Sequence, residues 1–261
     1  MKPTPFVLGL AASGLMIRQR RQRILAERLG AATLETLLNA IDANDAVTGA
    51  HVRRVARYSL ILCDALQLDE RRCHSVERVA LFHDIGKIHE AITDIFHERS
   101  KLTPAERRAV MTHPQRGADV LAPLAPFYPD LAKGVLSHHE RWDGSGYPRH
   151  MKGKRIPLEA RVIAIPDTFD AITNSRRYSE ARSVAEAVRV IGDGRGTLFQ
   201  PELVDLFLSP PILDAIEKAR AESKRPRNLH HRRDKKKIGD DVPDIKFRWR
   251  TSGGARQPQG R

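Results

Sequence analysis

The sequence predicts an all-α protein, and three observations lead to that expectation. Helix-forming residues abound, whereas aromatic residues make up 5% of the 261 residues. Apolar residues recur along most of the chain at the spacing of an amphipathic helix. No stretch shows a convincing alternation of apolar and polar residues, which is the pattern of a half-buried strand.

Helical spacing of apolar residues defines the expected elements. The segments are residues 34–41, 52–66, 76–88, 105–121, 131–138, 158–173 and 184–192. Pro104 fits the first turn of the helix at 105 because its missing N–H is not needed there, and Gly194 follows the end of the last segment. Pro166 lies inside 158–173, where a proline removes a helical hydrogen bond at a cost of roughly 3 kcal/mol. A tolerated kink is therefore expected in that helix.

The chain is long enough for one sizeable core with tails at both ends. It divides into a short apolar and basic segment at residues 1–30, a folded domain at 31–218 and a basic tail at 219–261. The net charge of +13 belongs to the ends, because residues 1–30 hold six Lys/Arg against one acid and residues 219–261 hold fourteen against five. The middle is close to neutral, so the high pI says little about catalysis.

The two ends of the chain suggest location and contacts. Residues 219–261 are rich in Pro, Gly and charge, which predicts disorder; they either solubilise the protein or attract nucleic acid or an anionic membrane. Residues 6–17 are mostly apolar but shorter than the roughly 20 residues that span a bilayer. The basic cluster follows them, which is the wrong order for a secretory signal. Cys63 and Cys73 lack Cys-x-x-Cys spacing. We therefore expect a cytoplasmic protein, with peripheral membrane contact left open.

Two histidine-containing motifs are the most informative feature of the chain. HDIGK occupies residues 83–87, and HHERWDGSGYP occupies residues 138–148. Imidazoles suit Zn, Mn, Fe or Ni, and a carboxylate can bridge two such ions. Paired ions about 3.5–4 Å apart activate water and neutralise phosphoryl charge. If residues 76–88 are helical, His83 and Lys87 share one face, and Lys87 can oppose a phosphate. The motifs therefore indicate a metal-dependent phosphohydrolase.

Other histidines and aspartates are candidates for the remaining ligands. His51 begins a helical run, and His113 precedes Pro114, which disfavours the helical region at a helix boundary. Asp167 and Asp170 lie in an apolar segment, where a buried carboxylate needs a partner or a metal. His51 or His113 alone would more often be a structural histidine. Together with the two motifs, they favour ligation.

Residues from about 34 to 208 resemble an HD-GYP domain, the branch of the HD phosphohydrolase superfamily known for cyclic di-GMP phosphodiesterases. The resemblance rests on the HD motif at 83–84, the HHExxDGxGYP pattern at 138–148 and the sequence PLEARVIAIPDTFDAIT at 157–173. It implies an HD-superfamily helical bundle with an HD-GYP extension. It also implies hydrolysis of cyclic di-GMP to pGpG by a metal-bridging hydroxide, with further cleavage to GMP left open.

The resemblance implies roles for individual side chains. The metal ligands would be His51, His83, Asp84, His113, His138, His139 and Asp167. Asp84 would bridge two divalent ions, for which Fe or Mn is favoured and Ni, Zn, Co or Mg is left open. Lys87 would contact the substrate phosphate. The other residues expected to bind substrate or support the pocket are Gly146, Tyr147, Pro148, Asp170 and Arg176.

Three differences from the family pattern leave alternatives open. Val47 stands where members with a third metal place a Glu, so two metals are expected. Ser179 stands where the family often has a second basic residue, which leaves another cyclic dinucleotide or a nucleotide monophosphate as a substrate. Pro166 directly precedes Asp167. A site damaged by this proline would leave a module that binds nucleotide or signalling partner proteins without turnover.

Overall fold

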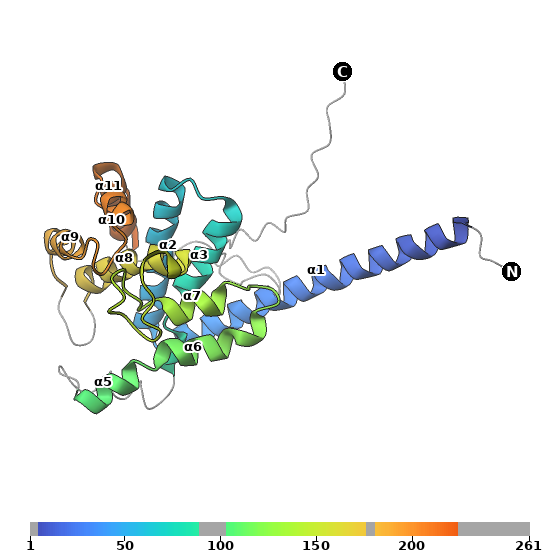
Figure 1. Cartoon of the computed structure of the whole chain (residues 1–261), viewed down its shortest axis with the longest axis horizontal. Helices are drawn as coiled ribbons and strands as arrows, with labels where there is room; N and C mark the ends of the chain where they lie inside the picture. Colours follow the sequence, from blue (N-terminus) through green and yellow to red (C-terminus); the bar gives the residue numbers. More distant parts are fainter. Residues whose placement is uncertain (1–4, 89–102, 176–180, 224–261) are drawn as a thin grey trace, which may run out of the picture. The chain divides into compact units, whose positions relative to one another are not determined.

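The computed structural model describes residues 5–88, 103–175 and 181–223, and the regular elements in these ranges are helices (Figure 1). The α-helices are α1 (Pro5–Asn44), α2 (Ala46–Ala65), α3 (Glu70–Phe82), α5 (Pro104–Val110), α6 (His113–Leu121), α7 (Leu131–Ser137), α8 (Leu158–Thr173), α9 (Val184–Asp193), α10 (Pro201–Phe207) and α11 (Pro210–Ser223). The 3₁₀ turns are η1 (Ile85–Ile88), η2 (Ala122–Leu124) and η3 (Gly153–Arg155). The all-α prediction is confirmed. The expected disorder of the tail at 219–261 is wrong for residues 219–223, which form the end of α11 because this helix packs on α2. The tail from residue 224 onward lies outside the described ranges.

The core forms where α2, α3 and α8 pack against one another. Tyr58 of α2 lies edge-on to Phe169 of α8, with ring centroids 5.8 Å apart, and Phe169 lies 5.6 Å from Phe207 of α10. All three aromatic side chains are fully buried. α11 also packs on α2, and α9 packs on α8 (Figure 1). This packing fixes the three helices that carry or adjoin most of the predicted ligands.

The expected segments at 131–138, 158–173 and 184–192 correspond closely to α7, α8 and α9. The segment at 52–66 lies in α2, but this helix begins at Ala46 after the capping residue Asp45, so His51 does not begin the helix as expected. The expected segment at 34–41 is the end of the much longer α1, where Leu34, Leu38 and Ile41 are buried and α1 packs against α2. α1 passes residue 30 without interruption, so the suggested boundary there does not coincide with a helix end. None of the helices in the described ranges is long and apolar enough to cross a membrane. α10 and α11 were not predicted.

The expected helix at 76–88 was wrong in extent. α3 ends at Phe82, and the HDIGK residues form a turn followed by η1. His83 and Lys87 are therefore not an i, i+4 pair on one α-helix. Instead, the Lys87 backbone N–H donates to the Asp84 carbonyl at 2.9 Å, three residues back. The tighter turn places the Lys87 side chain beside Asp84.

Gly86 permits the close packing that follows this turn. A Cβ atom at Gly86 would lie 2.1 Å from the His113 carbonyl oxygen and 2.6 Å from the Gly117 nitrogen. Real Cβ atoms do not approach backbone atoms so closely, so glycine alone fits without movement of the chain. The HDIGK turn can therefore lie directly on the first turns of α6, beside His113.

The expected helix at 105–121 is two helices, because α5 ends before α6 begins at His113. Pro114 supplies the reason: it has no N–H to bond the Val110 carbonyl four residues back. That carbonyl accepts a hydrogen bond from His113 Nδ1 at 2.7 Å instead. The predicted helix boundary is confirmed, but His113 is itself helical, contrary to the bias expected before proline. Pro104 lies in the first turn of α5, as predicted.

Candidate metal centre

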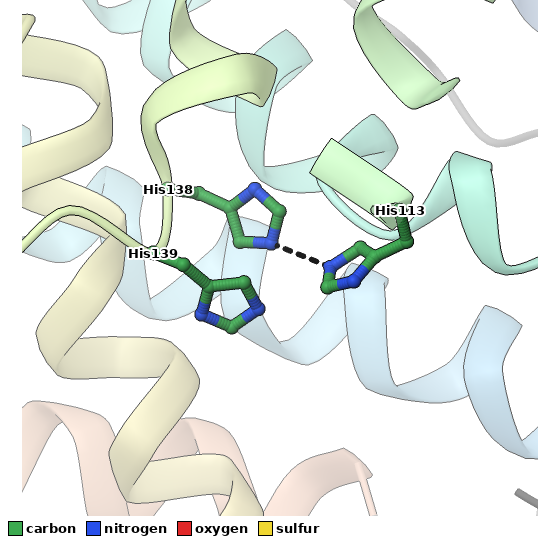
Figure 2. Close-up of side chains that lie close together, drawn as sticks. All are labelled: His113, His138 and His139. Carbon is green, nitrogen blue, oxygen red and sulfur yellow. Dashed lines mark hydrogen bonds between the residues drawn. The ribbon is translucent and has the colours of Figure 1, made fainter. Parts of the chain in front are cut away.

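Six of the seven predicted metal ligands form two compact clusters. The clusters are His51, His83 and Asp167, and His113, His138 and His139. Within each cluster, one nitrogen or carboxylate oxygen from each residue lies within 4.8 Å of the others. Figure 2 shows the second cluster, whose three imidazoles converge from α6 and from the segment after α7. Residues distant in sequence are thus brought together in two groups suited to cations.

Asp84, the seventh predicted ligand, lies between the two clusters and faces both. Its Oδ2 is 3.5 Å from His83 Nε2 and 3.9 Å from His51 Nε2. Its Oδ1 is 3.5 Å from His113 Nε2 and 3.9 Å from His138 Nε2. The side chain is nearly fully buried. Each carboxylate oxygen is therefore directed at a different cluster, which is the arrangement of a bridging carboxylate.

Three of these histidines are oriented by the same backbone contact, a hydrogen bond from Nδ1 to the carbonyl three residues earlier. The pairs are His83 with Ala80 at 2.8 Å, His113 with Val110 at 2.7 Å and His138 with Val135 at 2.6 Å. Because a carbonyl oxygen only accepts, Nδ1 carries the hydrogen in each ring. The neutral ring then presents the lone pair of Nε2, as a metal ligand requires.

The buried nitrogens of these rings fit a cation. His113 Nε2 and His138 Nε2 lie 3.1 Å apart (Figure 2). Since both rings carry hydrogen on Nδ1, two lone pairs face each other when the rings are neutral. Two nitrogens bound to one ion at about 2.0–2.1 Å have a comparable separation. His83 Nε2 is also buried, and no described residue hydrogen-bonds to it. The donor set therefore suits divalent metals.

The electrostatic surroundings favour the protonation states that bind metal. Burial lowers the pKa of His113 to about 4, with a further contribution from the Lys87 ammonium. Burial lowers the pKa of His139 to about 3 and that of His138 well below its ordinary value. Burial alone would raise the pKa of Asp84, but Lys87 and the surrounding imidazoles hold it well below its usual range. The centre thus combines neutral imidazoles with an ionised carboxylate at neutral pH.

His51 is oriented by a carboxylate instead of a carbonyl. Its Nδ1 donates to Asp170 Oδ2 at 2.7 Å. Arg54 clamps the same carboxylate with two hydrogen bonds, of 2.7 Å from Nε and 2.9 Å from Nη2. Burial would raise the pKa of Asp170, but the bonds from His51 and Arg54 lower it. Asp170 is 1% exposed. The structure therefore favours a supporting role behind His51 over direct contact with a substrate.

Asp167 reaches the centre despite the proline before it. α8 runs from Leu158 to Thr173 through Pro166 without interruption. Asp167 Oδ1 lies 3.2 Å from His51 Nε2 and 3.8 Å from His83 Nε2. The proline has therefore not removed this carboxylate from its cluster.

Lys87 pairs with Asp84 and is the more exposed of the two side chains. Its Nζ is 2.7 Å from Asp84 Oδ2, and its side chain is 22% exposed. An ammonium at this position can oppose an anion that enters the centre. Arg176, the other cation expected to meet substrate, lies outside the described residues.

The predicted pocket residues at 146–148 pack against His139. The Tyr147 ring stacks on the His139 ring, with centroids 4.8 Å apart and planes 27° apart. Burial raises the pKa of the Tyr147 phenol, and the charges of Asp84 and Asp167 add to this effect. A Cβ at Gly146 would lie 2.5 Å from the His139 carbonyl oxygen. Gly146 therefore lets the segment that ends in Pro148 fold directly over His139.

Sequence reasoning missed three residues that shape the centre. Arg54 donates two hydrogen bonds to Asp170. Its position about one helical turn after His51 could have indicated that it lies near the site. Gly86 permits the contact with α6. Glu140 is buried and accepts two backbone hydrogen bonds; its place in the HHExxDGxGYP pattern was the available signal.

The helical fold carries two clusters that could hold metal ions, and sequence comparison gives its family. Residues 35–203 match the HD domain family. The chain therefore belongs to the HD domain family, and the resemblance to HD-GYP proteins is confirmed.

Curated relatives agree with this assignment. The chain is 35% identical over 213 residues to the cyclic di-GMP phosphodiesterase response regulator RpfG of Xanthomonas campestris, covering 77% of this chain and 56% of the relative. It is 36% identical over 174 residues to the 3'3'-cGAMP-specific phosphodiesterase 2 of Vibrio cholerae, covering 66% and 33%. A cyclic di-GMP phosphodiesterase of Thermotoga maritima is 36% identical over 177 residues, covering 67% and 48%. The chain thus spans about half of these relatives' length or less.

Solved structures share the fold at low sequence identity. The HD domain of the Listeria monocytogenes phosphodiesterase PgpH, in complex with cyclic-di-AMP, aligns with a TM-score of 0.53 and 18% identity, covering 74% of this chain and 98% of that one. A cyclic GMP-AMP specific phosphodiesterase of V. cholerae aligns with a TM-score of 0.52 and 23% identity, covering 76% and 55%. Both are similar to this chain in fold.

Proposed function

We propose that this chain is a metal-dependent phosphodiesterase that hydrolyses cyclic di-GMP to linear pGpG. The observation that carries the proposal is the position of Asp84, whose two carboxylate oxygens face two separate histidine clusters. Two clusters joined by one carboxylate are suited to two divalent ions. The imidazole and carboxylate donors are compatible with Fe or Mn, and also with Zn, Ni or Co.

Each group of residues has a distinct task in this proposal. His51, His83 and Asp167 would hold one ion, His113, His138 and His139 would hold the other, and Asp84 would contribute an oxygen to each. When bound, paired ions lower the pKa of coordinated water and neutralise charge on phosphoryl oxygens. Lys87 would stabilise the charge that develops on the phosphate. Water adds across one phosphodiester bond, leaving a 5'-phosphate and a free 3'-hydroxyl.

The choice of cyclic di-GMP rests on the relatives. RpfG and the T. maritima protein are named for that substrate, and both are about one-third identical to this chain over the matched region. The V. cholerae relative named for 3'3'-cGAMP shows that the same framework serves a related cyclic dinucleotide. Ser179, which stands where the family often has a basic residue, lies outside the described residues. A substrate panel must therefore contain both nucleotides.

The test is cyclic dinucleotide turnover by protein purified without oxygen, with bound metal quantified in the same sample. We expect turnover with about two metals per chain. Asp84→Ala removes the oxygens between both clusters and is expected to abolish turnover and lower metal content. Asp193→Asn, which changes an exposed carboxylate on α9, is the control and should match the wild type.

Other results would lead to different conclusions. Turnover of 3'3'-cGAMP in place of cyclic di-GMP would correct the substrate and keep the reaction class. Metal binding without turnover of any cyclic dinucleotide would contradict the phosphodiesterase. Turnover that persists in Asp84→Ala would contradict the proposed centre.

A further inference from the structure

We propose that Glu140 is a positioning residue that orients His139 in the metal centre by clamping the loop at residues 141–151. This inference rests on the proposed metal centre, and it assigns a task to a buried carboxylate that the proposed reaction does not use. Glu140 follows the His138-His139 pair directly and is only 5% exposed. A buried carboxylate needs hydrogen-bond partners, and those partners identify what it holds.

Both partners of the Glu140 carboxylate are backbone amides at the far end of the loop. The Arg149 N–H donates to Oε1 at 2.7 Å, and the Met151 N–H donates to Oε2 at 2.9 Å. Each oxygen therefore fixes a different point of the returning chain. The Arg149 side chain adds a third tie, because its Nη2 donates to Ser137 Oγ at 2.6 Å. The loop end is thus attached just before and just after the histidine pair.

Within the clamped loop, the segment around Gly146 and Tyr147 touches His139 directly. The Tyr147 N–H donates to the His139 carbonyl at 3.2 Å, and the Tyr147 ring stacks on the imidazole. A Cβ at Gly146 would lie 2.6 Å from the Glu140 carbonyl carbon. Movement of the loop would therefore move the ring that covers His139.

His139 depends on this loop because it lacks the anchor that the other histidines have. His83, His113 and His138 donate Nδ1 to a carbonyl, and His51 donates Nδ1 to Asp170. Within the part of the chain that the structure describes, no hydrogen bond is found for either ring nitrogen of His139. Its contacts are ring contacts with His113, His138 and Tyr147. Stacking against a fixed Tyr147 is therefore what restrains the His139 ring.

The experiment measures metal binding, so it is independent of turnover. The 261-residue chain, stripped of metal, is titrated with Co²⁺. The visible absorption spectrum and the affinity of each bound ion are recorded. Glu140→Gln keeps the side-chain size but turns an NH₂ group toward one of the two amides. Asp143→Asn is the matched control, because Asp143 is exposed in the same loop and an amide oxygen can replace its bond to Ser145 N–H.

We expect Glu140→Gln to weaken the binding of one Co²⁺ by about tenfold, the low end for partners that orient metal ligands. Its spectrum should shift toward that of His139→Ala, and Asp143→Asn should match the wild type. Glu140→Gln should add no further loss to His139→Ala, because both act on one ligand. Tyr147→Leu, which removes the stacked ring and leaves the clamp intact, should shift the spectrum in the same direction.

Wild-type affinity and spectrum in folded Glu140→Gln would overturn the inference. So would an additive loss in the double variant, which would show that Glu140 acts elsewhere. If Glu140→Gln does not fold, an unchanged spectrum in Tyr147→Leu overturns it. Failure of the proposed function is distinguishable, because it would be seen as Co²⁺ binding by the wild type without turnover of cyclic dinucleotides.

Discussion

Asp84 and Asp170 are both buried carboxylates, and their surroundings give them different tasks. The imidazole nitrogens that face Asp84 carry lone pairs and therefore cannot donate a hydrogen bond to it. The Lys87 ammonium lies 2.7 Å from Asp84 Oδ2. Asp170 accepts hydrogen bonds from His51, Arg54 and the Asn174 side-chain amide. The lone pairs of Asp170 are therefore largely used within the protein, whereas Asp84 is suited to cations. Both residues are aspartates, so it is their partners that distinguish the proposed ligand Asp84 from the supporting residue Asp170.

Arg54→Ala tests the support behind His51. The change removes two hydrogen bonds from a carboxylate that is 1% exposed, so we expect a loss of about 2 kcal/mol in the unfolding free energy of the metal-free protein. Metal affinity should fall by about tenfold or more. Urea denaturation and metal titration measure the two effects. Arg189→Ala, whose partner Asp193 is largely exposed, should cost under about 0.5 kcal/mol; equal costs for the two variants would contradict the prediction.

At the scale of secondary structure, the centre is built where helices end. His83 follows the last residue of α3, His113 is the first residue of α6 and His138 follows the last residue of α7. At each of these places a carbonyl accepts a hydrogen bond from an imidazole. An uninterrupted helix would use that carbonyl for its own backbone. The helix ends therefore supply both the position and the orientation of these three candidate ligands.

Gly86→Ala tests the contact between η1 and α6. The added methyl group would meet backbone atoms of His113 and Gly117, so the two segments must separate. We expect destabilisation of about 1–3 kcal/mol and fewer metals per chain. Gly192→Ala in α9 is the control, since its Cβ would meet only Leu208 Cδ1 at 3.8 Å, and alanine is favoured in a helix. Thermal unfolding and metal content serve as readouts, and a harmless Gly86→Ala would refute the close-packing argument.

Pro166→Ala asks whether the proline harms the metal centre. α8 continues through Pro166 and places Asp167 beside His51. We therefore expect the same number of bound metals in the variant and in the wild type, measured after anaerobic purification. Metal bound by the variant but absent from the wild type would show that the proline damages the site. That result would favour the alternative of a binding module without turnover.

At the scale of the folded unit, α11 closes the bundle against α2 and α8. Ala219 is buried, and its carbonyl accepts a hydrogen bond from Arg57, which also pairs with Glu222. Arg220 donates to the Thr173 carbonyl at the end of α8. These contacts lie beyond residue 218, where the sequence placed the end of the domain. The helix that carries them continues to Ser223.

Two truncations test where the domain ends. A chain that stops after residue 223 keeps the α11 contacts, whereas a chain that stops after residue 218 loses them. We expect the shorter chain to be less stable by about 2 kcal/mol, from roughly 1 kcal/mol for each lost hydrogen bond. The melting temperature of the metal-free protein should fall by roughly 4–8 °C. Equal melting temperatures for the two truncations would support a boundary at residue 218.

The sequence located much of the fold and of the site, and the misses have identifiable causes. The expected helix at 158–173 has the bounds of α8, because its apolar spacing is uninterrupted. The expected helix at 76–88 extends past the end of α3 because Ile85 and Ile88 continue the apolar helical spacing. In the structure α3 ends at Phe82, and Gly86 packs on α6. Seven ligands were predicted and their side chains converge, but their roles stay predictions. Glu140 is part of the HHExxDGxGYP pattern, but its task was missed because its partners, the Arg149 and Met151 amides, lie beyond that pattern.

By itself, the sequence determined the helical class and named the candidate ligands, because apolar periodicity and adjacent donor residues are local properties. It also indicated the family through motifs that are continuous in the chain. The tertiary structure decided which atoms meet. Asp84 lies between two clusters, Arg54 holds Asp170 and the loop folds over His139 because helices distant in sequence pack together. Such contacts depend on the packing of whole faces, which no single stretch of sequence specifies.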